Sequence, residues 1–283
     1  MLSQQQFSAL STMLKDETAV VLETGKEYLV ESRLTCLMHE EGYATLSDLI
    51  DAVLLRANPS LNKKVLLALT TNETSFFRDL GAFELLKSKV IPEMLQSRAS
   101  TRTLTLWSAA CSAGQEPYSL AIALRESFPE LASWKVKIMA SDINPNMVAR
   151  AARGVYSSLE VNRGLPIQLL LKHFTQQGDD YFVSSEIKSM ISFFERNLIA
   201  DWPPGPVDVL FMRNVLIYFD TDTKRRIFEK VKATLAPDGY LFLGTAETPY
   251  RIVEGFSKVM GASNVYQREG AGAQKKGEQP LKV

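Results

Sequence analysis

Apolar residues recur at helical spacing in the first part of the chain. They form two stretches, at Phe7, Leu10, Met13 and Leu14 and at Tyr28, Leu29, Leu34, Leu37 and Met38. This period places the apolar side chains on one face of a helix. Gly42 and the cluster Asn58-Pro59-Ser60 interrupt the pattern, as turn residues do. We therefore predict a small all-helical domain over residues 1–80.

A polar segment follows the last apolar run of this domain. Residues 65–69 are apolar and lead into Thr70-Thr71-Asn72-Glu73-Thr74. Thr70 and Glu73 have the spacing of a capping box, in which two side chains satisfy the free N–H groups at a helix start. The pattern predicts a helix over about 75–94, broken near Pro92.

From residue 103 onward, short apolar runs alternate with helical patterns. The predicted strands cover 104–107, 136–140, 191–194, 207–212 and 240–243, with helices over 118–127 and 223–235 among them. This alternation favours an α/β domain, here 81–268, with a mostly parallel sheet and right-handed crossovers. A turn is predicted at Pro237-Asp238-Gly239 and a final edge strand over 264–268.

Two segments do not follow this alternation. Residues 155–190 carry mixed short apolar runs around Gly178-Asp179-Asp180, which predicts an inserted segment with a small antiparallel sheet. Residues 269–283 are rich in Gly, Gln and Lys and have no apolar periodicity, so we predict a disordered tail.

The balance of charge constrains the partners. The 283 residues include 32 Lys and Arg and 32 Asp and Glu, so the formal net charge is zero. Residues 1–79 hold seven basic and eleven acidic side chains, which leaves that part at −4 and the remainder at +4. A chain without net charge has no strong electrostatic attraction to nucleic acid, and we expect none to bind.

The few cysteines and histidines bear on metal binding, on disulfides and on the cellular compartment. Cys36 and Cys111 form no Cys-x-x-Cys pair, and His39 and His173 are the only histidines. This set predicts no metal site and no disulfide framework, and it favours a reducing compartment. The start MLSQQQFSAL lacks the regions of a signal peptide, and no run of about 18 apolar residues is present to span a bilayer. We expect a cytoplasmic protein without membrane insertion.

The candidate chemistry lies where the predicted strands end, because open α/β sheets bind ligands outside the carboxyl ends of their strands. The first strand leads into the small-residue loop 108–114 and a helix start at Gln115-Glu116, which suits a negative ligand group or is simply a tight turn. The loop has no Gly-x-Gly-x-x-Gly and no Walker lysine, which argues against a nicotinamide enzyme and a P-loop nucleotidase.

The other strand ends also carry polar residues. Asp142 suits ribose hydroxyls or caps the next helix, and Asn197 suits an adenine edge or a turn. Arg213 and Asn214 stand where a reacting group would lie, and Tyr218 follows them, alternatively as a core tyrosine. Together, these groups suit a nucleoside that bears a charged amino-acid tail.

At these residues the chain resembles the chemotaxis receptor methyltransferases, the CheR family. The resemblance covers most of residues 65–268 and lies in the segments TTNETSFFRD, LWSAACSAGQEPYSLAIAL, ASDINPNMVARAARGVYS, VLFMRNVLIYFD and LAPDGYLFLGTAE. It implies a class I, Rossmann-like domain that binds S-adenosylmethionine (AdoMet), a small N-terminal all-α domain and an inserted β-subdomain.

The resemblance also implies roles for particular residues. It places Asn72, Thr74 and Arg78 over the cofactor, with Arg78 pairing the methionine carboxylate. It places Glu116 near the amino end of AdoMet and Asp142 on the ribose. The remaining cofactor-binding residues are Asn197 and Leu198 by the adenine and Asn214 and Val215 along the pocket. As catalytic residues it gives Tyr218 beside the transferred methyl group, with Arg213 second.

The activity implied is methyl transfer to receptor glutamates in the bacterial cytoplasm, which yields glutamate 5-O-methyl esters and S-adenosyl-L-homocysteine (AdoHcy). The expected partner is the cytoplasmic domain of methyl-accepting chemoreceptors, and we expect a monomer. Two alternatives stay open, namely a non-enzymatic AdoMet-binding signalling module and the same fold acting on another acceptor. A dehydrogenase is a more distant fourth.

Two features depart from the family pattern. The segment 155–190 is short and has no Gly-Gly loop, which argues against tethering through a receptor's C-terminal pentapeptide. In the first domain, Lys26 and Arg33 are interleaved with acidic residues at Glu23, Glu27 and Glu31, so no basic receptor-docking face is predicted there.

Overall fold

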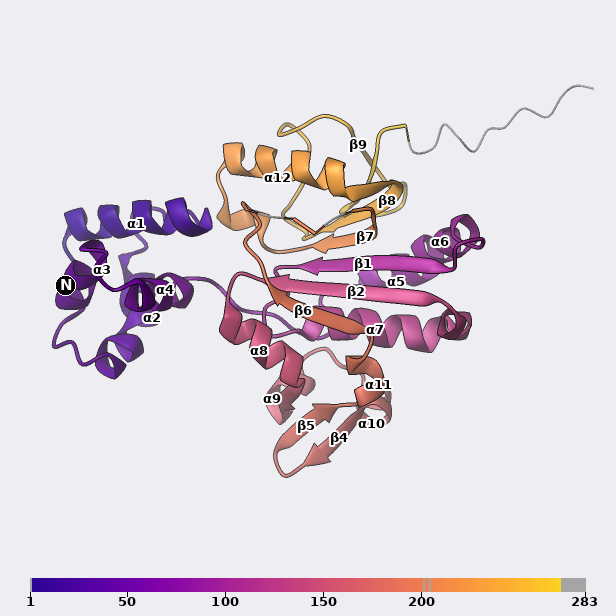
Figure 1. Ribbon diagram of the computed structural model, residues 1–283, viewed down its shortest axis with the longest axis horizontal. Coiled ribbons are helices and arrows are strands. Elements are labelled where there is room, and N and C mark those ends of the chain that lie inside the picture. The colour runs from indigo at the N-terminus through magenta and orange to yellow at the C-terminus, as the bar shows by residue number, and fades with distance from the viewer. Residues whose placement is uncertain (1, 201, 204, 271–283) are drawn as a thin grey trace, which may run out of the picture. The chain divides into compact units, whose positions relative to one another are not determined.

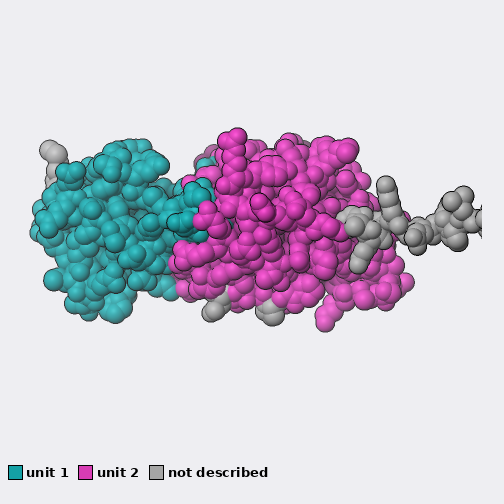
Figure 2. Space-filling model, turned by 90° about the horizontal axis from the view of Figure 1, so that it is seen from above, with its two compact units in different colours: residues 1–73, 218–224 teal, residues 74–217, 225–283 magenta. Residues whose placement is uncertain are grey.

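The computed structural model describes residues 2–200, 202–203 and 205–270, so most of the tail predicted over 269–283 lies outside the described residues. The chain forms two compact units, coloured teal and magenta in Figure 2. The helical unit comprises residues 1–73 and 218–224, and the sheet unit comprises 74–217 and 225–283. Among the described helices, none is long and apolar enough to cross a membrane.

The helical unit is built on four helices. They are α1 Gln4–Thr18, α2 Glu27–Glu40, α3 Leu46–Leu54 and α4 Pro59–Ala68. Ser3 and Thr45 form capping boxes, and Asn58 caps α4 ahead of Pro59. The apolar faces meet in one core, which includes Leu10, Leu14, Val30, Leu34, Leu49 and Val65. The predicted helical packing is therefore confirmed.

The helix predicted to begin near Ser75 begins later, and the capping box at Thr70 does not form. The Thr70 hydroxyl instead donates to the Leu67 carbonyl oxygen (2.7 Å) at the end of α4. Phe77 and Asp79 have φ of 47° and 58°, which a right-handed helix does not allow. The helix α5 therefore starts only at Leu80, because the chain first buries Phe76 and Phe77 in the core of the sheet unit.

The rest of that helix changes pitch where a break was predicted. α5 spans Leu80–Leu85, a π-helical turn η1 spans Leu86–Val90, and α6 spans Ile91–Ser97. Pro92 lies in the first turn of α6, where its missing N–H and fixed φ are tolerated. The break near Pro92 is thus a single π-helical turn within a continuing helix.

The main sheet has seven strands in the order β6-β2-β1-β7-β8-β10-β9 (Figure 1). Their bounds are β1 Thr103–Ala109, β2 Lys135–Asp142, β6 Ile191–Glu195, β7 Val207–Met212, β8 Leu235–Leu243, β9 Phe256–Lys258 and β10 Val265–Arg268. The first five of these in chain order run parallel. After β1, the chain adds strands first on one side and then on the other, so the strand order reverses between β1 and β7. This is the switch point where such sheets bind ligands.

Helices cross between the parallel strands, as the alternating pattern predicted. They include α7 Gln115–Ser127, the 3₁₀ turn η2 Pro129–Ser133, α8 Pro145–Arg153 and α12 Thr221–Thr234. The strand β7 is buried along its whole length, and the core around it includes Leu106, Leu120, Ile122, Phe211 and Phe242. Burial on both faces is typical of a central parallel strand.

The far edge of the sheet differs from the prediction. β10 is not the edge strand, because it lies antiparallel between β8 and the unpredicted β9. The predicted turn at Pro237-Asp238-Gly239 lies within β8 as an irregularity in the strand pairing, since Val207 pairs with Leu235 but Val209 pairs with Tyr240. At Gly239 a Cβ atom would lie 3.0 Å from the carbonyl oxygens of residues 207 and 208, so this close approach needs glycine.

The inserted β-subdomain is confirmed. Its antiparallel sheet has the order β3-β5-β4, with β3 Val155–Ser157, β4 Phe174–Gln177 and β5 Asp180–Val183. Short helices α9 Ser158–Val161, α10 Ile167–His173 and α11 Ser185–Lys188 accompany it. The Tyr156 hydroxyl donates to the Ala113 carbonyl oxygen (2.7 Å), which fixes this sheet to the loop after β1.

Candidate active site

The loop after β1 is wound tightly. Ala110, Ser112 and Gly114 have φ of 58°, 49° and 96°. This positive-φ region is unfavourable for residues other than glycine. The end of β2 holds this conformation, because the Cys111 N–H donates to the Ser141 carbonyl oxygen (2.9 Å) and the Ser112 N–H donates to Asp142 Oδ2 (2.8 Å). The tight strand-to-helix turn is therefore present, and its backbone is fixed at the switch point.

Asp142, at the end of β2, is buried with 6% of its surface exposed. Its Oδ1 accepts the Asn144 N–H (2.9 Å), while its Oδ2 accepts the Ser112 N–H. Asn144 is the residue that caps α8, by accepting the Asn146 N–H (3.0 Å), so the helix-cap interpretation of Asp142 is wrong. Burial raises the pKa of the Asp142 carboxyl, and these backbone N–H groups oppose the rise. A carboxylate has about four lone-pair sites, so Asp142 keeps the capacity to accept a hydroxyl hydrogen.

Glu116 is the second residue of α7 and is largely buried, with 14% of its side-chain surface exposed. Its Oε1 accepts the Ser108 hydroxyl (2.7 Å), and its Oε2 lies 3.2 Å from Arg213 Nη1. Burial raises the pKa of Glu116, and Arg213 opposes this effect. The switch point thus holds two carboxylates that water reaches poorly, an environment that favours a cationic or hydroxyl-bearing ligand.

Arg213 follows β7 and has only 2% of its side chain exposed. Its guanidinium pairs with Asp79 and Glu116 and donates to the Arg78 carbonyl oxygen (3.0 Å). These contacts tie residues 78–79, which lead into α5, to the ends of β7 and α7. They make Arg213 a bridge within the site, while its predicted second place in catalysis stays a prediction.

The loop after β7 is held by a residue that the sequence reasoning did not select. Glu247 accepts the backbone N–H groups of Asn214 (2.9 Å), Val215 (2.8 Å), Leu216 (2.7 Å) and Gly244 (2.6 Å). Two signals in the sequence pointed to it, namely its place four residues after the buried strand β8 and its position at the end of the segment LAPDGYLFLGTAE. The predicted pocket residues Asn214 and Val215 are thus fixed through their backbone.

The end of β6 forms a turn. Asn197 Oδ1 accepts the Ile199 N–H (3.1 Å), so the turn interpretation is confirmed, and Leu198 is buried. The Leu198 carbonyl oxygen accepts the Trp202 indole N–H (2.8 Å), and this ring packs edge-on against Trp107 at 4.9 Å. The role of Asn197 and Leu198 beside an adenine stays a prediction.

The predicted site residues are distributed over both units. Most of them, from Thr74 and Arg78 to Val215, belong to the sheet unit, and hydrogen bonds join Arg78, Glu116 and Arg213 there. Asn72 and Tyr218 belong to the helical unit. Tyr218 ends the 3₁₀ turn η3 Leu216–Tyr218 and is only partly buried, so it is not an ordinary core tyrosine.

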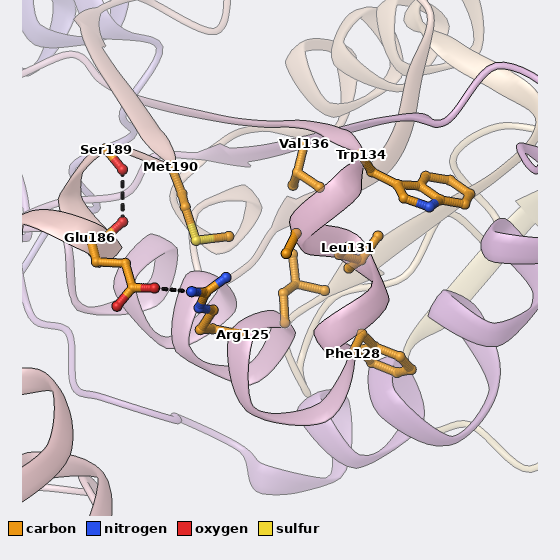
Figure 3. A pocket seen from close by; sticks show the side chains of 10 residues that line it. Arg125, Phe128, Leu131, Trp134, Val136, Glu186, Ser189 and Met190 are labelled. Atoms are coloured by element: carbon orange, nitrogen blue, oxygen red, sulfur yellow. Dashed lines mark hydrogen bonds and ion pairs between the residues drawn. The ribbon is translucent and has the colours of Figure 1, made fainter.

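A hollow elsewhere in the sheet unit lies away from this site (Figure 3). It is lined by Leu131, Trp134, Val136 and Met190, with Arg125 paired to Glu186 at its rim. Val136 is the second residue of β2, and Met190 directly precedes β6. The hollow therefore opens at the amino ends of the strands, opposite the edge where α/β sheets bind their ligands.

Two family models match most of the chain. Residues 72–265 match the family model described as CheR methyltransferase, SAM binding domain, and residues 5–70 match CheR methyltransferase, all-alpha domain. The chain belongs to the CheR methyltransferase family. The resemblance found in the sequence is thereby confirmed, as is an AdoMet-dependent methyltransferase fold with an all-α N-terminal domain.

Curated relatives agree over nearly their full length. The chain is 37% identical over 267 residues to chemotaxis protein methyltransferase 1 of Pseudomonas aeruginosa, covering 93% of this chain and 97% of the relative. It is 39% identical over 246 residues to chemotaxis protein methyltransferase Cher2 of Pseudomonas putida, covering 85% and 89%. It is 36% identical over 263 residues to a chemotaxis protein methyltransferase of Vibrio parahaemolyticus, covering 91% and 94%.

The residues at the switch point fit AdoMet, the cofactor of the matched domain. AdoMet carries a positive sulfonium and a positive ammonium, and the carboxylates of Glu116 and Asp142 lie at neighbouring strand ends. The Nε atom of Arg213 is buried and makes no hydrogen bond to the described residues. Within the described ranges, no cluster of three or more His, Cys, Asp or Glu side chains is arranged to hold a metal ion.

Proposed function

We propose that the protein transfers the methyl group of AdoMet to glutamate side chains of methyl-accepting chemoreceptors in the bacterial cytoplasm. The products are glutamate 5-O-methyl esters and AdoHcy. The observation that carries the proposal is the pair of partly desolvated carboxylates, Glu116 and Asp142, at the switch point of a CheR-family chain. The names of the curated relatives support the link to chemotaxis.

Cofactor binding follows from the chemistry of the strand ends. We assign the ribose hydroxyls to Asp142 and the ammonium group to Glu116, a buried carboxylate that already pairs with Arg213 on one oxygen. We assign the methionine carboxylate to Arg78, with Asn72 and Thr74 over the cofactor. The adenine would lie by Asn197 and Leu198, and Asn214 and Val215 would line the pocket.

The reaction itself needs no strong base. The methyl group of a sulfonium is already activated, and a glutamate carboxylate is already ionised near pH 7. A carboxylate oxygen forms a bond to the methyl carbon while the carbon–sulfur bond breaks, and AdoHcy leaves as a neutral thioether. Because opposite charges disappear in this step, a site that excludes water and aligns the oxygen with the carbon–sulfur bond accelerates it.

We assign the alignment of the substrate to Tyr218. Its hydroxyl can donate a hydrogen bond to the glutamate carboxylate and turn one oxygen toward the methyl group. Arg213 is the second candidate, although its guanidinium already pairs with Asp79 and Glu116.

Receptor docking does not use a basic face of α2 in this proposal. Arg33 on α2 donates to the Leu69 carbonyl oxygen and to the Thr71 hydroxyl (2.8 Å), which holds the end of α4. Lys26 pairs with Glu23 (2.6 Å). In the inserted sheet, the β4–β5 connection carries Gly178 without a second glycine, so we expect no tethering through a receptor pentapeptide. We expect the protein to act as a monomer.

Peptide mapping tests the proposal. The protein is incubated with AdoMet and the purified cytoplasmic domain of a chemoreceptor from the same host, and the receptor is digested and analysed by mass spectrometry. We expect a mass increase of one methylene on glutamate residues. Methylation of other side chains would show that glutamate is not the acceptor. AdoMet binding without any methylation would favour a non-enzymatic signalling module.

The Tyr218→Phe variant tests the catalytic assignment, because it removes only the hydroxyl. Loss of a hydrogen bond to a charged group costs about 1.5–3 kcal/mol, so we expect kcat to fall by about ten- to a hundredfold. Calorimetry should give unchanged AdoMet affinity. An unchanged kcat would remove Tyr218 from the mechanism.

A further inference from the structure

Glu247 places one buried carboxylate against four backbone donors. Only 5% of its surface is exposed. Its Oε1 accepts the N–H groups of Val215 and Leu216, and its Oε2 accepts those of Asn214 and Gly244, all within 2.9 Å. Hydrogen bonds to an ionised acceptor are the strong class, and four of them converge on this one side chain.

The backbone that Glu247 holds has an unusual path. Asn214 has φ of 58° as the chain leaves β7 and enters η3. At Gly244 a Cβ atom would lie 2.7 Å from Glu247 Oε2 and 2.8 Å from Asn214 Nδ2, so the residue directly after β8 has to be glycine. The turn after β7 and the turn after β8 are thus joined through a single carboxylate.

The four hydrogen bonds also indicate what Glu247 does not do. A carboxylate offers about four lone-pair sites, and all four are directed at backbone N–H groups. Glu247 therefore has no acceptor left for a ribose hydroxyl or for a substrate. Apart from the effect of its charge on Glu116, whose pKa burial and this charge both raise, Glu247 can influence the reaction only through the backbone that it holds at residues 214–216 and Gly244.

We propose that Glu247 is a positioning residue for methyl transfer, which fixes the loop after β7 so that Asn214 and Val215 line the AdoMet pocket and η3 presents Tyr218. This inference depends on the proposed function, and it adds a residue that contacts neither cofactor nor substrate. The bonded N–H groups of Asn214 and Val215 belong to the predicted pocket, and that of Leu216 opens the turn that ends in Tyr218.

The Glu247→Gln variant tests this directly. It keeps the size of the side chain, but turns an NH₂ group toward two backbone N–H donors. We expect AdoHcy affinity, measured by calorimetry, to weaken by about tenfold or more, and kcat to fall as well. In a Tyr218→Phe background, the further loss of kcat should be smaller, because both changes act on one arrangement.

Asp208→Asn is the matched control. Asp208 is equally buried, accepts the Thr105 N–H (2.8 Å) and pairs with Arg98, but it lies at the amino ends of the strands. We expect this variant to lower the melting temperature and to leave AdoHcy affinity unchanged. If Glu247→Gln does not fold, as judged by circular dichroism, Glu247→Asp takes its place under the same criteria.

The outcomes separate the inference from the proposed function. Weaker AdoHcy binding in the Glu247 variant, but not in the Asp208 control, supports the inference even if no receptor is methylated by the wild-type protein. AdoHcy affinity that equals the wild-type value, or that falls no further than in Asp208→Asn, overturns it.

Discussion

Carboxylates near the strand ends, among them Asp142 and Glu247, accept hydrogen bonds from the backbone of turns. Asp142 was predicted from its place after a buried strand, but its bond to the Ser112 N–H was not, because the two residues stand thirty positions apart in the chain. Glu247 was missed for the same reason, since three of its four donors lie about thirty positions earlier, in the turn after β7. Strand ends can be identified from sequence, whereas the turns that a given carboxylate holds depend on the strand order.

Asp142→Ala should weaken AdoMet binding by roughly 2 kcal/mol, because the ribose hydroxyls lose their acceptor. It should also lower the melting temperature, since the N–H groups of Ser112 and Asn144 lose theirs. Calorimetry and thermal unfolding measure the two effects separately. Unaltered AdoMet affinity would remove Asp142 from the cofactor site.

Glu116 should make AdoMet binding depend on pH. Burial raises the pKa of its carboxyl, so the group takes up a proton at a higher pH than an exposed glutamate does. Only the ionised form pairs with the ammonium of AdoMet, so affinity should fall as pH is lowered from 7 through this raised pKa. In Glu116→Gln, the dependence should be absent. A pH profile identical to that of the wild-type protein would contradict this assignment.

At the scale of elements, the sequence predicted most helices and strands, and it failed where burial or pairing decided the path. Helical periodicity did not reveal that Phe76 and Phe77 enter the core of the sheet unit, which delays α5 to Leu80. The irregularity in β8 and the edge strand β9 depend on partners from other parts of the chain. Local propensity contains no information about these partners.

Tyr218 and the start of α12 belong to the helical unit, although they follow a strand of the sheet unit. The Tyr218 carbonyl oxygen accepts the Val21 N–H (2.8 Å), and Lys15 of α1 pairs with Asp220 (2.8 Å). The hydrogen bond from Lys15 holds the pKa of Asp220 well below its usual range. The helical unit thus contributes to fixing the segment that carries Tyr218.

Lys15→Ala should therefore slow receptor methylation and leave AdoMet affinity unchanged, because it releases one contact of this segment. The change should be small, since the ion pair is largely exposed. Lys26→Ala, which breaks the exposed pair with Glu23, is the matched control and should leave the rate unchanged. Equal rates for wild-type protein and Lys15→Ala would show that the pair does not act on Tyr218.

At the scale of the sheet unit, a stabilising ion-pair cluster lies at the amino ends of the strands, and the candidate active site lies at their carboxyl ends. Arg98, directly after α6, donates to Asp208 (2.9 Å) and in a bidentate manner to Asp238 (2.9 and 2.6 Å) at the amino ends. The pKa of Asp238 is lowered by its hydrogen bond from Arg98. The carboxyl ends carry Glu116 and Asp142, whose pKa values burial raises.

Asp238→Asn should lower the free energy of unfolding near pH 7 by about 1 kcal/mol, after allowance for solvent screening. Because the pKa of Asp238 is lower in the folded state, its contribution is present above the unfolded pKa and is lost as pH falls through the folded pKa. The difference between variant and wild type should therefore shrink in acid, while AdoMet affinity stays the same. Denaturant unfolding at several pH values measures this, and a difference that grows in acid would contradict it.

The central claim, carboxyl methyl transfer from AdoMet to receptor glutamates, is tested most directly by the stability of the product in base. The protein is incubated with methyl-labelled AdoMet and membranes that contain the host's chemoreceptors, and the labelled receptor band is treated with mild base. Our account predicts that the label is released as volatile methanol, as a carboxyl ester requires. Label that stays on the receptor after base treatment would contradict the account, since it would show methylation of nitrogen or carbon.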